Sequence, residues 1–332
     1  MNADADADLR VAADAIRACI ASGGTLALMC HVSPDGDALG SMLALHHLAR
    51  SQGVHTVASF PNPFSVAAHY RSVPGIELLC DSANFPERPT TVVTFDCGSL
   101  GRLVELGVPA AFARDHGQLI VLDHHATNDR YGSINVVDTR AAATAVVVHA
   151  LARELGWPLT REAATCLYVG LVTDTGRFQF SCSDPAVFEM AAELVAFGIP
   201  IARLNRELFD EHSYAYLQLA SRVLARAVLD ERRELIHSRV TQADLAEFGV
   251  EYDEIEGMID WLRTAAEAEV AVIYKEAADG VRVSIRSLTK VDVGAVAGSL
   301  GGGGHVRAAG FTMPGPIDAV HSRLLRAFDN VR

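Results

Sequence analysis

Three short apolar runs in the first half of the chain each end on a side chain that can bind a cation. TLALMCH (25–31) ends on His31, TVVTFD (91–96) on Asp96 and QLIVLD (118–123) on Asp123. Runs of this length that alternate with helical patterns predict the buried strands of a parallel sheet with helices on both faces. Because ligands bind beyond the carboxyl ends of such strands, we expect these three side chains to lie close together.

The second half of the chain has a different pattern. Beyond Ala225, alternating strands, a helical stretch at 253–266 and a final helix predict a smaller α+β domain with a mixed sheet. A chain of 332 residues also exceeds what one hydrophobic core usually holds. We therefore expect a parallel-sheet α/β domain over 1–198, a helical linker over 199–222 and the smaller domain over 223–332. The Ala-Asp run at 3–8 is expected to be a disordered start.

The net charge limits the partners of the chain. Its 28 Lys and Arg residues face 41 Asp and Glu residues, which gives a formal net charge of −13. Binding of long nucleic acid is driven by neutralisation of phosphates and needs the opposite sign. An anionic substrate must therefore be held locally, by metal ions, backbone N–H groups or a few Arg and His side chains.

The composition also bears on where the chain works. No apolar run approaches the roughly 18 residues needed to span a bilayer, and the acidic start has no hydrophobic signal core. The six cysteines include no C-x-x-C pair. We expect a cytoplasmic protein with reduced thiols and no membrane partner. Tyr214 and Tyr216 in the polar linker could support a homodimer.

The first candidate ligands lie in the sequence His31-Val-Ser-Pro-Asp35-Gly-Asp37. The Pro and Gly residues turn the chain sharply after the first strand, which places an imidazole and two carboxylates near one volume. This combination suits a divalent cation. Asp-Gly-Asp is also a common turn, however, and Asp37 could instead cap the following helix.

Three further positions along the chain carry candidate ligands. Asp96 closes a buried strand, where an ionised carboxylate is costly unless it is solvated, capping or metal-bound. In Asp123-His124-His125 the adjacent histidines point to different sides, so we expect one to bind a cation and the other to face the substrate. Asp123 could orient a histidine. Asp174 follows an apolar helix. Both Asp96 and Asp174 could instead be helix-cap or turn residues without a role in metal binding.

Together these positions predict a centre with two divalent ions. Four carboxylates and two imidazoles are expected at one edge of the sheet: Asp35, Asp37, Asp96, Asp174, His31 and His124. Two ions that share a carboxylate can activate a water and neutralise a phosphoryl oxygen during in-line displacement. The absence of ligating-type cysteines favours Mn²⁺ over a structural Zn²⁺ site, and Mg²⁺ and Co²⁺ can use the same ligands.

A glycine run marks the smaller domain. Gly301 to Gly304 precede His305, and consecutive glycines let backbone N–H groups approach an anion closely. A helix starting near His305 would add its positive end. No Gly-Lys-Ser/Thr follows, so the run is not a P-loop. Arg286 is a second candidate anion contact, although an exposed arginine without a role and a flexible glycine linker are the plain alternatives.

These motifs, in this order, resemble those of the DHH phosphoesterase family, named for the Asp-His-His seen here at 123–125. The smaller domain resembles the DHH-associated domain, which carries a Gly-Gly-Gly-His signature. The compact two-domain form is similar to NrnA-type enzymes, which degrade very short RNA and convert 3′-phosphoadenosine 5′-phosphate (pAp) to AMP. The resemblance implies a Mn²⁺-dependent phosphohydrolase whose substrates are short oligoribonucleotides and pAp.

The resemblance also implies roles for single residues. One Mn²⁺ would be held by His31, Asp35 and Asp96, and the other by Asp37, Asp96, His124 and Asp174. Catalysis would depend on Asp96 as the bridging ligand, Asp123 as an orienting carboxylate and His125 as a contact of the scissile phosphate. The nucleotide portion of the substrate would be held by Arg286, Gly302, Gly303, Gly304 and His305.

Several rival functions share these motifs. Some relatives cleave cyclic di-AMP or its linear product. A RecJ-like single-strand exonuclease would need further nucleic-acid-binding modules, for which 332 residues leave no room. A family II inorganic pyrophosphatase uses a Lys/Arg-based signature in place of the glycine run. A non-catalytic nucleotide sensor would bind nucleotides without consuming them.

Overall fold

The computed structural model describes residues 3–331, which divide into two compact units between Leu208 and Phe209. The division falls inside the segment 199–222 that was predicted to link two domains. That segment contains α7 (Ile201–Asn205) and most of α8 (Tyr214–Ala225). None of the described helices is both long and apolar enough to cross a membrane.

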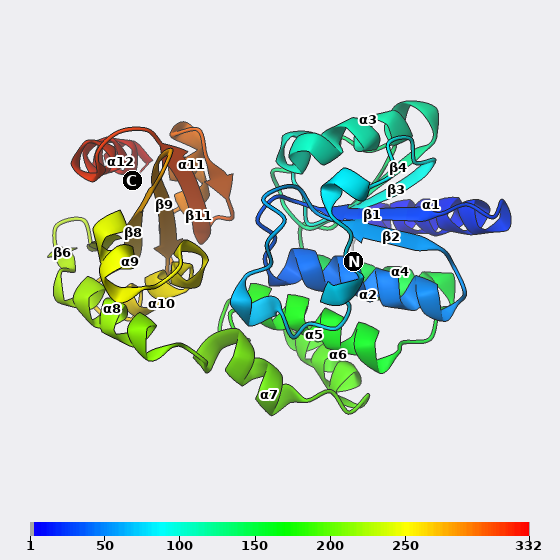
Figure 1. The fold of residues 1–332 in the computed structure, drawn as a ribbon, viewed down its shortest axis with the longest axis horizontal. Coiled ribbons are helices and arrows are strands. Elements are labelled where there is room, and N and C mark those ends of the chain that lie inside the picture. Colours follow the sequence, from blue (N-terminus) through cyan, green and yellow to red (C-terminus); the bar gives the residue numbers. More distant parts are fainter. Residues whose placement is uncertain (1–2, 332) are drawn as a thin grey trace. The chain divides into compact units, whose positions relative to one another are not determined.

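The first unit is built on a five-stranded sheet in which all strands are parallel (Figure 1). Its strands, in spatial order, are β2 (Thr56–Ser59), β1 (Leu26–Cys30), β3 (Thr91–Phe95), β4 (Gln118–Asp123) and β5 (Ile134–Val137). The prediction of a parallel-sheet α/β domain is therefore confirmed. The chain goes from β1 to β2 on one side and returns to β3 on the other, and such a reversal is where ligands bind in open parallel sheets.

Helices cover both faces of this sheet. Figure 1 shows α2 (Gly36–Ser51), α4 (Thr144–Leu155) and α5 (Arg161–Asp174) on one face and α3 (Gly107–His116) on the other. The chain continues through α6 (Pro185–Val195), which packs on α5. The prediction of a disordered start is wrong, because the Ala-Asp run forms the first turns of α1 (Ala3–Ala21). Alanine has the highest helix propensity, acidic residues suit a helix start, and α1 packs against α4 and β5.

Two glycines allow α2 and α5 to pack closely. A Cβ atom on Gly40 would lie 2.4 Å from the carbonyl oxygen of Cys166 in α5. A Cβ atom on Gly170 would lie 2.7 Å from the Oδ1 atom of Asp37. Any larger residue would separate the two helices. This crossing brings Asp37, in the first turn of α2, towards Asp174, the last residue of α5.

The second unit contains a six-stranded mixed sheet. Its strands, in spatial order, are β10 (Gly303–Gly304), β11 (Ala308–Met313), β9 (Gly280–Ser287), β8 (Val270–Ala277), β7 (Leu235–Val240) and β6 (Val228–Asp230). Only the pair β7 and β8 is parallel among these described strands, so the predicted α+β domain with a mixed sheet is confirmed.

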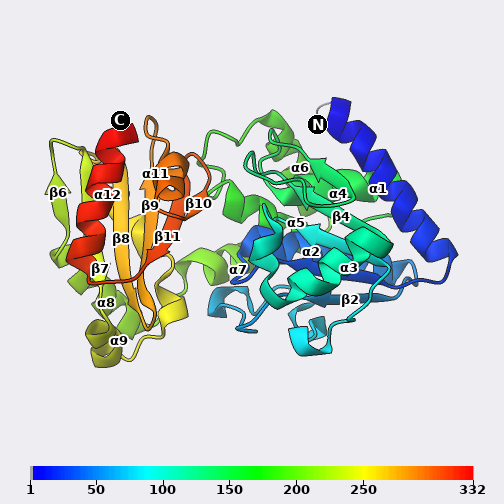
Figure 2. The same ribbon diagram turned by 90° about the horizontal axis from the view of Figure 1, so that it is seen from above.

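Separate hydrophobic cores cover the two faces of this sheet. Helices α11 (Val293–Ser299) and α12 (Ile317–Val331) pack on one face (Figure 2), and α8, α9 (Gln242–Phe248) and α10 (Met258–Leu262) pack on the other. The helical stretch predicted at 253–266 is broken into a 3₁₀ turn (Tyr252–Ile255) and α10. Tyr216 lies in the core of this unit with 1% of its surface exposed. It therefore cannot make the predicted dimer contact, whereas Tyr214 is exposed.

Candidate active site

Asp96 lies at the centre of the predicted ligand cluster. It follows β3, is 2% exposed and has a φ angle of 52°, a left-handed conformation that Asp adopts more readily than most residues. Its Oδ2 atom lies 3.6 Å from Nε2 of His31, and its Oδ1 atom lies 3.4 Å from Nε2 of His124. The hydroxyl of Thr144 donates to Oδ1 at 3.0 Å. The two oxygens of one carboxylate thus face two different histidines.

On one side of Asp96 lie His31 and Asp35. Nε2 of His31 is 4.0 Å from Oδ2 of Asp35, and ligand atoms of these three residues lie within 4.8 Å of one another. Asp35 caps α2, because its Oδ1 atom accepts from the backbone N–H of Ala38 at 3.0 Å. The alternative that Asp37 caps this helix is therefore wrong. The cap occupies one oxygen of Asp35 and turns the other towards His31.

On the other side of Asp96 lie Asp37, His124 and Asp174, whose ligand atoms form a second group within 4.8 Å. Nε2 of His124 is 3.2 Å from Oδ2 of Asp174 and 3.9 Å from Oδ2 of Asp37. Asp37 is completely buried, and Asp174 is the last residue of α5. The structure therefore brings together all six residues that were predicted to bind metal, in two groups that share Asp96 as their neighbour.

The start of α4 holds Asp37 in place, which the sequence did not predict. The backbone N–H of Thr144 donates to Oδ2 of Asp37, and the N–H of Ala145 donates to Oδ1 at 2.9 Å. Ser41, one turn further along α2, donates its hydroxyl to Oδ1 at 3.0 Å. The positive end of a helix dipole favours a carboxylate at this place. A helical pattern at 142–155 indicated where α4 begins, but no local signal shows which residue its first N–H groups face.

The Asp-His-His sequence forms a turn that is built around Asp123. This carboxylate is completely buried, and its Oδ1 atom accepts from the backbone N–H of His124 at 2.7 Å and of His125 at 3.2 Å. Nδ1 of His125 lies 2.8 Å from the same oxygen, and the amide of Asn128 donates to Oδ2. Nδ1 of His124 lies 3.1 Å from the carbonyl oxygen of Ala141, so its Nε2 atom faces the carboxylates.

Both histidine rings approach the same carboxylate, although they were predicted to point to different sides. Nδ1 of His125 lies 3.5 Å from Oδ1 of Asp96, only slightly further than Nε2 of His124. The rings are inclined by 72° with their centroids 4.9 Å apart. His125 is therefore placed beside the cluster, with its Nδ1 atom directed at Asp123.

The protonation equilibria of the cluster reflect a surplus of negative charge. Burial, together with the neighbouring carboxylates of Asp174 and Asp96, raises the pKa of Asp37 well above its usual range. Burial also raises the pKa of Asp174 to about 6. Burial disfavours the charged forms of both His124 and Asp96. Contact with Asp174 and Asp96 nevertheless raises the pKa of His124. Contact with His124 and His31 lowers the pKa of Asp96 in spite of its burial. Without cations, the cluster retains protons to offset its charge.

The donor set of the cluster fits divalent cations. Carboxylate oxygens and imidazole nitrogens are ligands for Mn²⁺, Mg²⁺ and related ions, and bound cations would supply positive charge to this cluster. Two buried thiols lie in the same region, but burial raises the pKa of Cys97 to about 11 and that of Cys30 well above its usual value. They remain neutral thiols, which are poor ligands because metals bind the thiolate.

In the second unit, the glycine run leads into a hairpin. Gly303 and Gly304 form β10 and pair with Gly310 and Ala309 of β11. The predicted helix near His305 is therefore wrong, because the N–H of His305 donates to the carbonyl oxygen of Ala308 at 2.8 Å and closes a turn. The neighbouring helix α11 lies before the glycine run and ends there. A helix N-terminus thus contributes nothing to anion binding at His305.

Close backbone packing requires glycine at two of these positions. A Cβ atom on Gly302 would lie 2.1 Å from the carbonyl oxygen of Gly310, and Gly304 has a φ angle of 140°. His305 itself is exposed on the turn. Arg286 lies on β9 opposite Ala308, is half-buried, and donates to the carbonyl oxygen of Ile285 at 3.1 Å.

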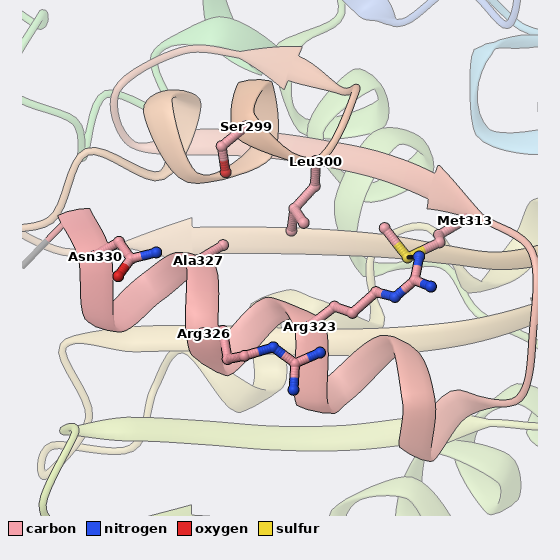
Figure 3. Close-up of a pocket in the computed structure, with 7 residues that line it drawn as sticks. All are labelled: Ser299, Leu300, Met313, Arg323, Arg326, Ala327 and Asn330. Atoms are coloured by element: carbon pink, nitrogen blue, oxygen red, sulfur yellow. Dashed lines mark hydrogen bonds between the residues drawn. The ribbon is translucent and has the colours of Figure 1, made fainter.

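Two shallow pockets lie in the second unit. One, with a volume of about 410 Å³, contains Gly301 and Gly302 of the glycine run together with Lys275, Arg282 and Ser284. The other, of about 480 Å³, lies between α11 and α12 and is shown in Figure 3. Its lining residues are Ser299, Leu300, Met313, Arg323, Arg326, Ala327 and Asn330. None of them was predicted to take part in function.

Comparison with known families and proteins assigns the two units to the same domain families that their sequence motifs resemble. Residues 25–171 match the N-terminal domain of the DHH family, and residues 233–331 match the DHHA1 domain. The bifunctional oligoribonuclease and PAP phosphatase NrnA of Thermus thermophilus is 34% identical over 322 residues, which cover 96% of this chain and 93% of that protein. The protein of the same name from Bacillus subtilis is 27% identical over 291 residues, which cover 86% and 88%.

Solved structures agree in fold. An exopolyphosphatase-related protein from Bacteroides fragilis has a TM-score of 0.87 at 22% identity, and the match covers 96% of this chain and 95% of that one. RecJ from Thermus thermophilus, solved in complex with Mn²⁺, has a TM-score of 0.56 at 16% identity and is matched over 54% of its length. The predicted family and fold are confirmed, and the two NrnA relatives are named as enzymes, as was expected for this chain.

Proposed function

Because the chain belongs to the DHH family, we propose that it is a metal-dependent phosphohydrolase of very short nucleotides. It would degrade short oligoribonucleotides to mononucleotides and remove the 3′-phosphate of pAp to give AMP. The observation that carries the proposal is the cluster in which two groups of ligands share Asp96. The names of the two NrnA relatives, which cover nearly the whole chain, support the choice of substrates.

The cluster would hold two cations, for which we propose Mn²⁺, with Mg²⁺ or Co²⁺ as alternatives. One ion would be held by His31, Asp35 and Asp96, and the other by Asp37, Asp96, His124 and Asp174. When bound, two such ions lower the pKa of a water that attacks phosphorus and neutralise charge on the phosphoryl oxygens. The donors from Thr144, Ala145 and Ser41 keep Asp37 oriented before any ion arrives.

His125 would act on the substrate rather than on the ions, and Asp123 would orient its ring. Asp123 fixes the ring of His125 through Nδ1, so the ring presents its Nε2 atom to a phosphoryl oxygen. Although burial opposes it, contact with Asp123 and the charge of Asp96 raise the pKa of His125. Since Nδ1 already donates to Asp123, the protonated ring can donate a charge-assisted hydrogen bond from Nε2 to the scissile phosphate.

The second unit would hold the nucleotide portion of the substrate. We propose that Gly302, Gly303, Gly304 and His305 and the guanidinium of Arg286 contact the nucleotide. Support comes from the exposed position of His305 on a tight turn and from the match of this unit to the DHHA1 domain. In this scheme residues 1–198 form the catalytic domain and residues 223–332 the substrate-binding domain, joined by 199–222.

The net charge argues for short substrates. A surplus of 13 negative charges disfavours a long phosphate backbone, which needs a basic track along its path. The likeness to RecJ concerns the fold and does not by itself extend the proposed substrates to long strands. Hydrolysis of linear or cyclic dinucleotides by the same centre remains the alternative within this class.

A product time course with the purified protein tests this proposal. The protein would be incubated with Mn²⁺ and pAp, linear and cyclic di-AMP, or labelled RNA of two, five and twenty-four nucleotides. Metal-free protein in EDTA and the Asp96→Ala variant serve as controls. We expect AMP from pAp and mononucleotides from the short RNAs, while the long RNA persists. Rapid degradation of the long RNA, or preference for cyclic di-AMP, would replace the proposed substrate class.

A further inference from the structure

One basic side chain that was not predicted to take part in function reaches the metal cluster. Arg102 lies in the 3₁₀ segment Leu100–Leu106, which follows Asp96 after a short turn. Its Nη2 atom lies 3.0 Å from Nδ1 of His31. Its carbonyl oxygen accepts from the N–H of Val32 at 3.0 Å, so the backbone of Arg102 is attached to the loop that carries His31.

The segment that carries Arg102 is held firmly. Glu105 accepts hydrogen bonds from the N–H of Asn62 and from the hydroxyl of Ser82, both at 2.7 Å. Val104 has φ and ψ angles of 44° and −119°, which are strained for a β-branched residue. Such strain persists only where the surrounding structure enforces it, and it is concentrated at functional sites. Arg102 therefore starts from a fixed position beside the cluster.

The contacts of His31 present a conflict that one proton cannot resolve. Its Nδ1 atom lies 2.9 Å from the carbonyl oxygen of Val32 and 3.0 Å from the guanidinium of Arg102. The carbonyl oxygen needs an N–H donor, whereas the guanidinium needs a lone pair. A cation on Nε2 requires the lone pair there and therefore places the proton on Nδ1. In that tautomer His31 donates to Val32, and Arg102 loses its acceptor.

We propose that Arg102 then binds a phosphoryl oxygen of the substrate and of the product phosphate. This inference rests on the proposed function, and it adds a specificity residue from the first unit. Within the described chain Arg102 forms no ion pair with a carboxylate, so its charge is available to an anion. The guanidinium, with its fork of N–H donors, matches phosphate geometry better than an ammonium does.

Binding of inorganic phosphate to the protein, measured by calorimetry with and without saturating Mn²⁺, tests the inference without turnover. We expect phosphate to bind well only in the presence of Mn²⁺, and Arg102→Ala to weaken it by about tenfold or more, the size of a lost charged hydrogen bond. Arg102→Lys should recover part of the affinity. Arg161→Ala is the matched control, because Arg161 is exposed at the far end of α5 from Asp174.

Mn²⁺ affinity and KM, measured on the same variants, distinguish phosphate binding from positioning of His31. We expect Mn²⁺ affinity to stay within about twofold and KM for pAp to rise with the phosphate dissociation constant. If Arg102→Ala and Arg102→Lys instead bind phosphate normally at saturating Mn²⁺, or lose Mn²⁺ and phosphate in parallel, the inference is wrong. Phosphate binding that depends on Arg102 without hydrolysis of pAp or RNA would contradict the proposed function alone.

Discussion

Two buried carboxylates, one in each unit, differ in the direction of their pKa shifts because different groups surround them. Glu269 in the second unit accepts from the hydroxyls of Ser287 and Thr289 and from three successive backbone N–H groups at 289–291. Although burial opposes it, these donors lower the pKa of Glu269 to about 2. Asp37 in the first unit also accepts three hydrogen bonds, yet its pKa is raised.

The difference lies in the neighbours of each carboxylate. Glu269 faces donors, and Arg307 joins the same loop by donating to Ser287 and to the carbonyl oxygen of Val291. Asp37 faces Asp174 and Asp96, so its ionisation adds charge to a group that already has a surplus. A buried charge that is fully satisfied within the protein stabilises the fold. A buried carboxylate that faces like charges instead indicates a site for a bound ligand, which the protein alone does not provide.

The largest effect is expected from removing the satisfied carboxylate. Glu269→Ala leaves three backbone N–H groups at 289–291 without their acceptor and should lower the free energy of unfolding by about 3 kcal/mol. Denaturant unfolding would measure this loss, with Glu269→Gln as the control, since its amide oxygen can still accept most of these bonds. Equal stability of Glu269→Ala and the native sequence would remove the contrast between the two carboxylates.

The opposite behaviour is expected of Asp174→Asn. The amide removes one charge from the cluster, so the metal-free protein should be at least as stable as the native sequence. Metal affinity of one of the two sites should fall by about 100-fold, because a charged ligand becomes neutral. Titration with Mn²⁺, followed by electron paramagnetic resonance, would resolve the two sites. If both sites keep their native affinity, the ligand assignment of Asp174 is wrong.

A smaller effect is expected at His305, for which we propose a contact with the nucleotide. His305→Ala should raise KM for pAp by about tenfold, the size of one lost polar contact, and leave KM for a nitrophenyl phosphodiester nearly unchanged. His305 is exposed, so the variant should keep the native stability. Equal changes for both substrates would contradict a role in nucleotide recognition.

The smallest effect concerns the stability of the metal-free protein at different pH values. Asp174, with its pKa raised to about 6, binds its proton more tightly in the native state than in the unfolded chain. Such a group stabilises the fold when protonated, so this contribution is lost as the pH rises through about 6. His124, whose pKa is also raised, acts in the same direction.

Thermal unfolding in EDTA at about pH 5 and pH 8 would measure this dependence. We expect the cluster to contribute about 1 kcal/mol less stability at the higher pH, and Mn²⁺ to restore it. Asp174→Asn isolates the effect, because the variant should show a smaller difference between the two pH values. An unchanged difference in this variant would show that the pH dependence arises elsewhere.

The sequence predicted the position of the cluster because three of its residues lie at strand ends. Apolar runs predicted the strands, and in a parallel sheet the residues that follow them meet at one edge, as His31, Asp96 and Asp123 do. What remained hidden depends on contacts between distant elements. The N–H groups of α4 that hold Asp37, the guanidinium of Arg102 on His31 and the close crossing at Gly40 leave no local pattern.

The errors have the same origin. Glycine has a low helix propensity, and pairing with β11 decides that residues 303–304 form a strand, which a local pattern does not show. The Ala-Asp run was predicted to be disordered because of its low complexity, whereas packing against α4 and β5 stabilises α1 as a helix. Tyr216 was placed on a polar surface, but α8 turns it into the core of the second unit.

A crystal structure of the protein grown with Mn²⁺, with anomalous diffraction recorded at the manganese edge, would test directly whether two cations share Asp96. We expect two anomalous peaks, one on either side of Asp96. One peak should be in contact with His31 and Asp35, and the other with Asp37, His124 and Asp174. A single peak, or two peaks that do not share Asp96, would contradict the proposed two-cation centre.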